Sequence, residues 1–91
     1  MKTMSDSVRE LLVRGVAAAK AGEESEARFY LNWVIRIEPP IETRLEALYY
    51  LCEVSHEPTE QRNFLEEILA TDPTHIRARR KLAILDGKLN D

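Results

Sequence analysis

The sequence predicts an all-α domain built from helical hairpins, and two observations lead to that prediction. Core residue types recur 34 positions apart, so that Leu31 and Pro39 are matched by Leu65 and Pro73. Within each period, apolar residues follow the helical i, i+3, i+4 spacing, and no segment alternates as a strand does. A fixed period with matched apolar positions indicates stacked helical units that bury their apolar faces against one another.

The first two helices are delimited by residues with known capping and breaking roles. Ser7 and Glu10 have the spacing of a capping box, in which each side chain bonds the backbone amide of the other residue. Gly22 suits the left-handed residue that ends a helix. The proline pair that begins at Pro39 stops the next helix, because proline lacks an amide donor. We therefore expect helices over about residues 8–21 and 24–37.

The remaining three helices are separated in the same way. The third begins directly after the prolines, and Pro58 occupies a position that the first turn of the fourth tolerates. Asp72 and Pro73 form the next break, and the fifth helix follows it. We expect these helices, each antiparallel to the one before, over about residues 41–55, 58–71 and 75–88. The positions that the period assigns to the core are Leu11, Ala27, Leu31, Val34, Leu45, Leu48, Leu65, Ile68 and Leu82.

The composition indicates one small globular domain in a reducing compartment. The chain has 91 residues, a net charge of −3 and a single cysteine, Cys52. A lone cysteine cannot form an internal disulfide, and the N-terminal residues lack the apolar stretch of a signal peptide. No apolar run is long enough to cross a membrane. We therefore expect a cytoplasmic protein with no membrane association and no general attraction to nucleic acid.

The repeated positions follow the pattern of a known family. In the first unit, about residues 8–41, they are Leu11, Gly15, Ala18, Ala27, Leu31 and Pro39. In the second unit, about residues 42–75, they are Leu45, Tyr49, Cys52, Gln61, Leu65 and Pro73. This spacing resembles the tetratricopeptide repeat (TPR), whose pattern is W-x2-L-G-x2-Y, then A-x3-F, then P. Residues 75–88 resemble the capping helix of that family, so residues 1–91 are interpreted as a single domain of this type.

The resemblance implies a binding function. Members of the family bind peptides or helices of other proteins on a concave face, which is lined by the first helix of each hairpin. The chain is therefore interpreted as a protein-interaction module, not an enzyme, with no cofactor. A groove with an apolar floor and a basic end would suit an amphipathic or extended partner that carries acidic residues. The expected groove residues are Leu12, Val16, Ala47, Tyr50, Arg77, Arg80, Lys81 and Ile84.

Two aromatic residues on the second helix suggest an alternative. Phe29 and Trp33 are one turn apart and widen the apolar arc of that helix, whereas the matching positions in the second unit hold Asn63 and Glu67. The interpretation that we prefer is that the aromatic pair packs on the fourth helix within the chain. The alternative is an exposed patch through which the domain self-associates as a homodimer or contacts another partner.

The basic fifth helix permits a further alternative, accessory binding of nucleic acid. It carries Arg77, Arg79, Arg80 and Lys81, which do not all share one face. No aromatic residue accompanies them for base stacking, so nucleic acid is a poor candidate. A solvated face that is partly paired with acidic residues of other helices is the simpler interpretation.

No catalytic or metal site is predicted. Cys52 is on the core-facing side of its helix and lacks a nearby histidine that would activate the thiol. His56 and His75 lie in turns, without further ligands at metal-binding spacing. The sequence also contains no glycine-rich loop that could hold a phosphate.

Overall fold

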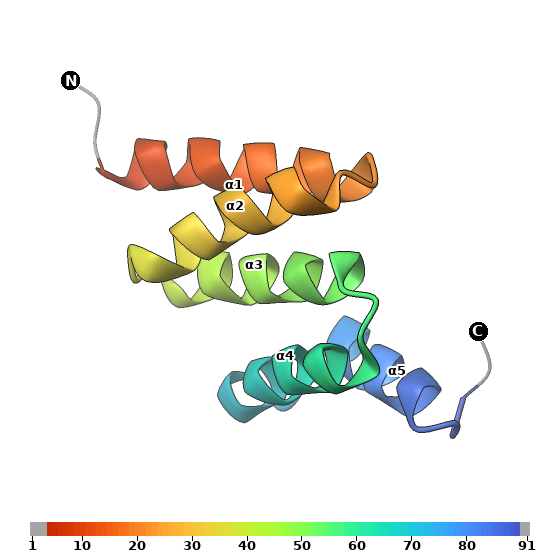
Figure 1. Ribbon diagram of the computed structural model, residues 1–91. Coiled ribbons are helices and arrows are strands. Elements are labelled where there is room, and N and C mark those ends of the chain that lie inside the picture. The colour runs from red at the N-terminus through yellow and green to blue at the C-terminus, as the bar shows by residue number, and fades with distance from the viewer. Residues whose placement is uncertain (1–3, 90–91) are drawn as a thin grey trace.

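The computed structural model describes the backbone of residues 4–89 and the side chains of residues 7–89. Within these residues the chain forms five α-helices and no strand, which confirms the predicted fold class (Figure 1). The helices are α1 (Met4–Lys20), α2 (Glu24–Arg36), α3 (Ile41–Val54), α4 (Pro58–Thr71) and α5 (Ile76–Leu85).

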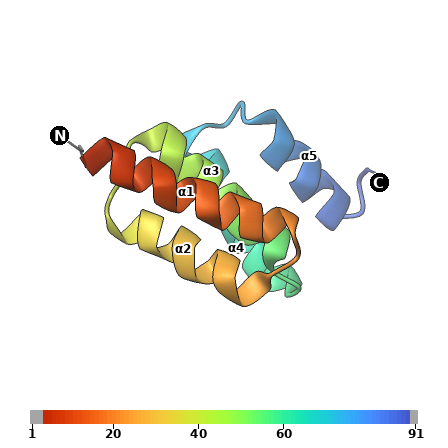
Figure 2. The same cartoon turned by 90° about the horizontal axis from the view of Figure 1, so that it is seen from above.

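The helices stack in an elongated array. α1 packs on α2 and α3, α3 also packs on α2 and α4, and α5 packs on α4. The array measures 49 × 27 × 17 Å along its principal axes. Figure 2 shows α5 to one side of the α1–α2 hairpin. The last helix is therefore joined to the array mainly through α4.

Glycines in the left-handed conformation follow α1 and α5. Gly22 has a φ of 77°, as predicted. Gly87 has a φ of 76°, and the Lys88 amide donates to the Ala83 carbonyl at 2.8 Å. This bond belongs to a Schellman motif, which terminates a helix. α5 therefore ends at Leu85, earlier than the expected end at residue 88.

The start of α1 also differs from the prediction. The helix begins at Met4, so Ser7 lies inside it and is not its N-cap. The serine–glutamate spacing marks a possible start, but residues 4–6 contain no proline or glycine that would stop the helix from extending. The other observed ends fall within one residue of those expected.

Two apolar clusters form the core, and α3 contributes to both. The first lies between α1, α2 and α3 and contains Leu31 and Leu51. The second lies between α3, α4 and α5 and contains Leu65 and Ile68. Phe64 packs against both clusters and connects them.

Most of the predicted core positions are buried. The confirmed positions are Ala27, Leu31, Val34, Leu45, Leu48, Leu65 and Ile68. Leu11 and Leu82 are only half-buried, because each lines a hollow at the surface. The period therefore identifies the helix faces that turn inward, and the two exceptions lie where those faces meet solvent.

α1 and α2 approach each other closely where Gly15 faces Leu31. A β-carbon at Gly15 would lie 2.5 Å from Cδ2 of Leu31 and 3.3 Å from its backbone nitrogen. Glycine leaves room for the leucine because it has no such carbon. The matching position of the second unit holds Tyr49, whose ring lies beside Arg77 and His75. Equivalent positions in the two hairpins are therefore packed differently.

Candidate interaction surfaces

One side of α1, α3 and α5, here named the inner face, carries the predicted groove residues. Leu12 and Val16 of α1, Tyr50 of α3 and Ile84 of α5 are half-buried, so each keeps part of its surface exposed to solvent. Ala47 is 0% exposed and belongs to the cluster between α1, α2 and α3. This corrects its assignment to the groove floor, because α1 packs directly on α3 and covers it.

Two of the predicted cations of the inner face are held in ion pairs with α3. Arg77 pairs with Glu46, and its guanidinium lies 4.3 Å from the centre of the Tyr49 ring. Lys81 pairs with Glu53. Burial alone would lower the pKa of Lys81, but the hydrogen bond that its ammonium donates to Glu53, together with the charge of that carboxylate, outweighs the effect of burial and raises the pKa. These cations therefore fix α5 against α3.

The other cations of the inner face are Arg9, Lys20 and Arg80. All three are exposed, and none forms an ion pair with a side chain of residues 7–89. The Lys20 ammonium lies 5.9 Å from the centre of the Tyr50 ring. Because Glu46 and Glu53 are already paired, the surplus charge of the inner face is positive.

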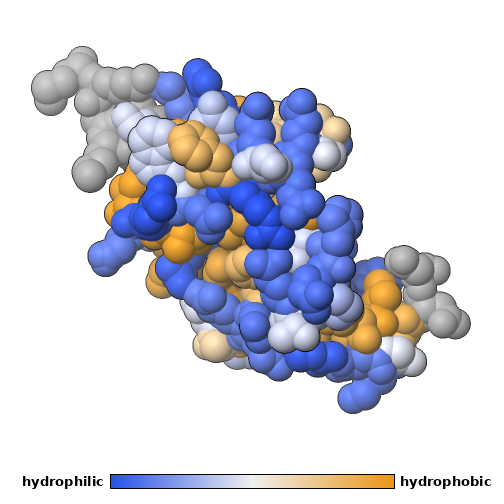
Figure 3. All heavy atoms as spheres, viewed as in Figure 1, coloured by the Kyte–Doolittle hydropathy of each residue, from blue (hydrophilic) through white to orange (hydrophobic). Residues whose placement is uncertain are grey.

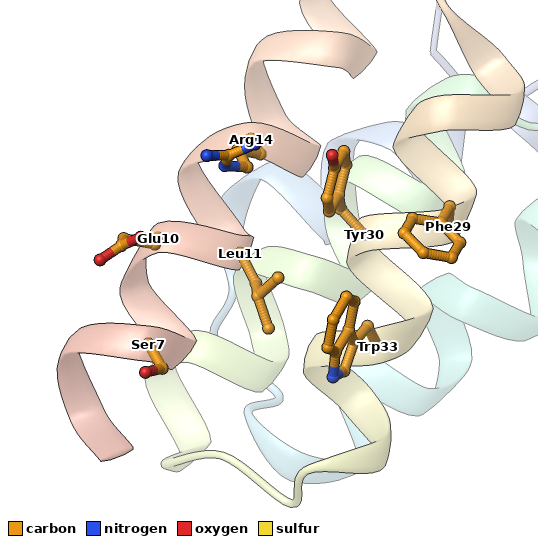
Figure 4. Close-up of a pocket in the computed structure, with 7 residues that line it drawn as sticks. All are labelled: Ser7, Glu10, Leu11, Arg14, Phe29, Tyr30 and Trp33. Carbon is orange, nitrogen blue, oxygen red and sulfur yellow. The ribbon is translucent and has the colours of Figure 1, made fainter. Parts of the chain in front are cut away.

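A second surface is formed by aromatic residues of α2 (Figure 4). Phe29 is 56% exposed and Trp33 is 41% exposed. Their ring centroids are 5.7 Å apart in an edge-to-face arrangement. The two residues border a hollow of about 390 Å³ between α1 and α2, in which Leu11 and Tyr30 also take part. The aromatic pair is therefore one continuous patch at the surface.

The preferred interpretation, that Phe29 and Trp33 pack on α4, is wrong. The neighbouring residue Arg28 is directed toward α4, where it donates to both carboxylate oxygens of Glu60 at 2.7 and 3.2 Å. The hydrogen bond from Arg28, followed by one from Ser55, lowers the pKa of Glu60. α2 thus presents a charged residue to α4, and its aromatic pair remains exposed to solvent. Figure 3 shows pale and orange atoms at the surface over α2.

Charged residues flank the aromatic pair at both ends. Glu26 precedes Phe29 and Arg36 follows Trp33, and both charged side chains are exposed. The spacing of three, four and three residues places all four on one side of the helix. We name Glu26, Phe29, Trp33 and Arg36 the α2 stripe. Its pattern is visible in the sequence, but the prediction considered the aromatic pair without its flanking charges.

The reactive side chains considered in the sequence have structural partners or lie apart. His75 Nδ1 accepts the Ala78 amide at 3.1 Å and so caps α5. His56 is exposed, with Nε2 3.4 Å from a carboxylate oxygen of Glu24. Among the described residues, no group of histidine, cysteine and carboxylate side chains is arranged to hold a metal ion.

Cys52 is a buried thiol. It is 0% exposed, its sulfur lies 3.7 Å from the Gln61 carbonyl oxygen, and burial raises its pKa to about 11. We expect the native thiol to react with a thiol reagent at pH 8 at least about 100-fold more slowly than the unfolded chain does. Timed alkylation with and without denaturant measures this ratio. Equal rates would show that Cys52 is accessible in the native protein.

The chain was compared with known protein families, curated proteins and solved structures. The chain matches no protein family, no curated protein and no solved structure. None of the helices in the described part of the chain is long and apolar enough to span a membrane.

Proposed function

We propose that the protein is an interaction module whose inner face binds an acidic, amphipathic segment of a partner protein. The observation that carries this proposal is the surplus of positive charge on that face of a chain whose net charge is −3. A charged surface of opposite sign to the rest of the chain favours a partner of matching chemistry and speeds its encounter.

The apolar side chains of the inner face would supply the area that a partner buries. Leu12, Val16 and Ile84 are half-buried, so each has apolar surface left to cover. Arg9, Lys20 and Arg80 lie on the same face and would meet the acidic side chains of an amphipathic helix or extended peptide. The resemblance to the tetratricopeptide repeat supports the same mode of binding, since that family uses the corresponding helices.

Arg80 offers a direct test, because it forms no ion pair with the described side chains of residues 7–89 and has a matched control beside it. We expect the protein to bind a labelled acidic amphipathic peptide, with the Kd measured by fluorescence anisotropy. The Arg80→Glu substitution should raise this Kd on the order of tenfold. Arg79→Glu makes the same charge change on another side of α5 and should leave binding nearly unchanged. Arg77 and Lys81 are poor test sites, since reversing them also breaks their pairs with α3.

The comparison of peptides and of salt concentrations completes this experiment. Binding should fall when lysines replace the acidic residues of the peptide, and when the salt concentration rises, because salt screens exposed charges beyond about 8–10 Å. Equal losses of peptide affinity in Arg79→Glu and Arg80→Glu would contradict a binding site localised on the inner face. Tighter, salt-sensitive binding to random duplex DNA would favour the nucleic-acid alternative.

A further inference from the structure

We propose that two copies of this chain associate through α2, which pairs antiparallel with α2 of the second copy about a two-fold axis level with residue 31. The interface is the α2 stripe of Glu26, Phe29, Trp33 and Arg36. None of these residues belongs to the inner face, so this dimer is independent of the proposed function. Each copy would keep its inner face available to a partner.

The spacing of the stripe fits a two-fold axis. When two helices run antiparallel about an axis level with residue 31, position 29 lies opposite position 33 of the second copy. By the same symmetry, position 26 lies opposite position 36. Phe29 therefore meets the second copy's Trp33, and Glu26 meets the second copy's Arg36. The stripe is about 15 Å long at 1.5 Å per residue, so one register satisfies all four residues at once.

The flanking charges identify the second copy as the occupant. Neither Glu26 nor Arg36 forms an ion pair with any side chain that the structure describes. The antiparallel register gives each of them a partner of opposite sign, twice in the dimer. A parallel pair would place Glu26 near the second copy's Glu26 and Arg36 near the second copy's Arg36. A surface that is complementary to itself is what a two-fold contact requires.

The aromatic residues supply the apolar centre of the contact. Phe29 and Trp33 are each more than two-fifths exposed, and aromatic residues at the centre of an interface contribute much of its binding energy. The hollow lined by Leu11 and Tyr30 adjoins the stripe and can receive an aromatic ring of the second copy (Figure 4). Arg28 is engaged with α4, so pairing through the stripe leaves the internal contacts of the chain unchanged.

The mass of the full chain in solution tests the proposal. Sedimentation at increasing concentration should show a rise from 10.5 kDa toward twice that value. Trp33→Glu should remain at the monomer mass and keep its helical circular dichroism, because the residue is exposed. Arg79→Glu, a charge change far from the stripe in sequence, should dimerise like the parent. A monomer at every concentration, or a dimer that tolerates Trp33→Glu, would overturn the proposal.

Charge exchange at the ends of the stripe tests the antiparallel register itself. Glu26→Arg and Arg36→Glu each place like charges opposite one another at two symmetric contacts, so each should raise the dimer Kd about tenfold. An equimolar mixture of the two variants should dimerise as tightly as the parent, because every contact is then between opposite charges. The double variant Glu26→Arg/Arg36→Glu should also dimerise as tightly as the parent, because it restores opposite charges at both contacts. Single variants without effect, or a mixture that does not recover, would rule out this register.

Discussion

The Leu31→Ala variant should lose about 2–5 kcal/mol of the free energy of unfolding, as truncation of a fully buried leucine usually does. Leu31 is 0% exposed and lies where α2 meets Gly15 of α1. Shortening it leaves a cavity that neighbouring helices can fill only in part, because α1 and α3 hold the first cluster on both sides. Chemical denaturation followed by helical circular dichroism measures the loss.

An exposed apolar residue provides the control for this measurement. Val13 is 61% exposed, and Val13→Ala should change the free energy of unfolding by no more than about 0.5 kcal/mol. Leu65→Ala, at the matching position of the second unit, should behave like Leu31→Ala because Leu65 is also 0% exposed. Losses below about 1 kcal/mol at both leucines would show that the two clusters do not form as described.

Gly15→Leu should also destabilise the protein, by about 3 kcal/mol, through overpacking of the contact between α1 and α2. Helix propensity alone predicts the opposite sign, since leucine is preferred to glycine inside a helix by nearly 1 kcal/mol. The steric effect should win, because even a β-carbon at this position would lie 2.5 Å from Leu31 Cδ2 and 3.3 Å from its backbone nitrogen. Thermal and chemical denaturation would both report the loss.

Ala17→Leu adds the same side chain to an exposed position of α1 and should leave stability nearly unchanged. The double variant Gly15→Leu/Leu31→Ala should be less destabilised than the sum of the single variants, because one change makes space that the other fills. Additive losses would mean that the two residues do not share one contact. A neutral Gly15→Leu would mean that α1 and α2 are further apart than the structure shows.

The helices and most of the core could be predicted from the sequence because their signals are local. Breakers such as Pro39 and Pro58 act on their own helix, and a period that matches Leu31 with Leu65 identifies the faces that turn inward. The end of α5 at Gly87 was equally local and was overlooked. The start of α1 could not be fixed in this way, since the spacing of Ser7 and Glu10 permits a start without requiring one.

The surfaces were harder to predict because they depend on how helices face one another. Arg77 and Glu46 are 31 residues apart, and Lys81 and Glu53 are 28 apart, so no local spacing relates them. The orientation of α2 is a similar case. The apolar arc of α2 is so wide that the sequence alone allows either the Arg28 side or the aromatic side of the helix to face α4. The ion pair of Arg28 with Glu60 shows that the Arg28 side faces α4.

α3 takes part in both apolar clusters, and this position has a consequence for partial unfolding. If α5 detaches and the second cluster loosens, α3 is still held by α1 and α2. If α1 loosens instead, α3 is still held by α4. The chain can therefore open from either end while its middle stays folded, and we expect the amide protons of α3 to be the best protected from exchange with solvent. Pairing through α2 would survive the loss of α5, whereas binding across the inner face would not.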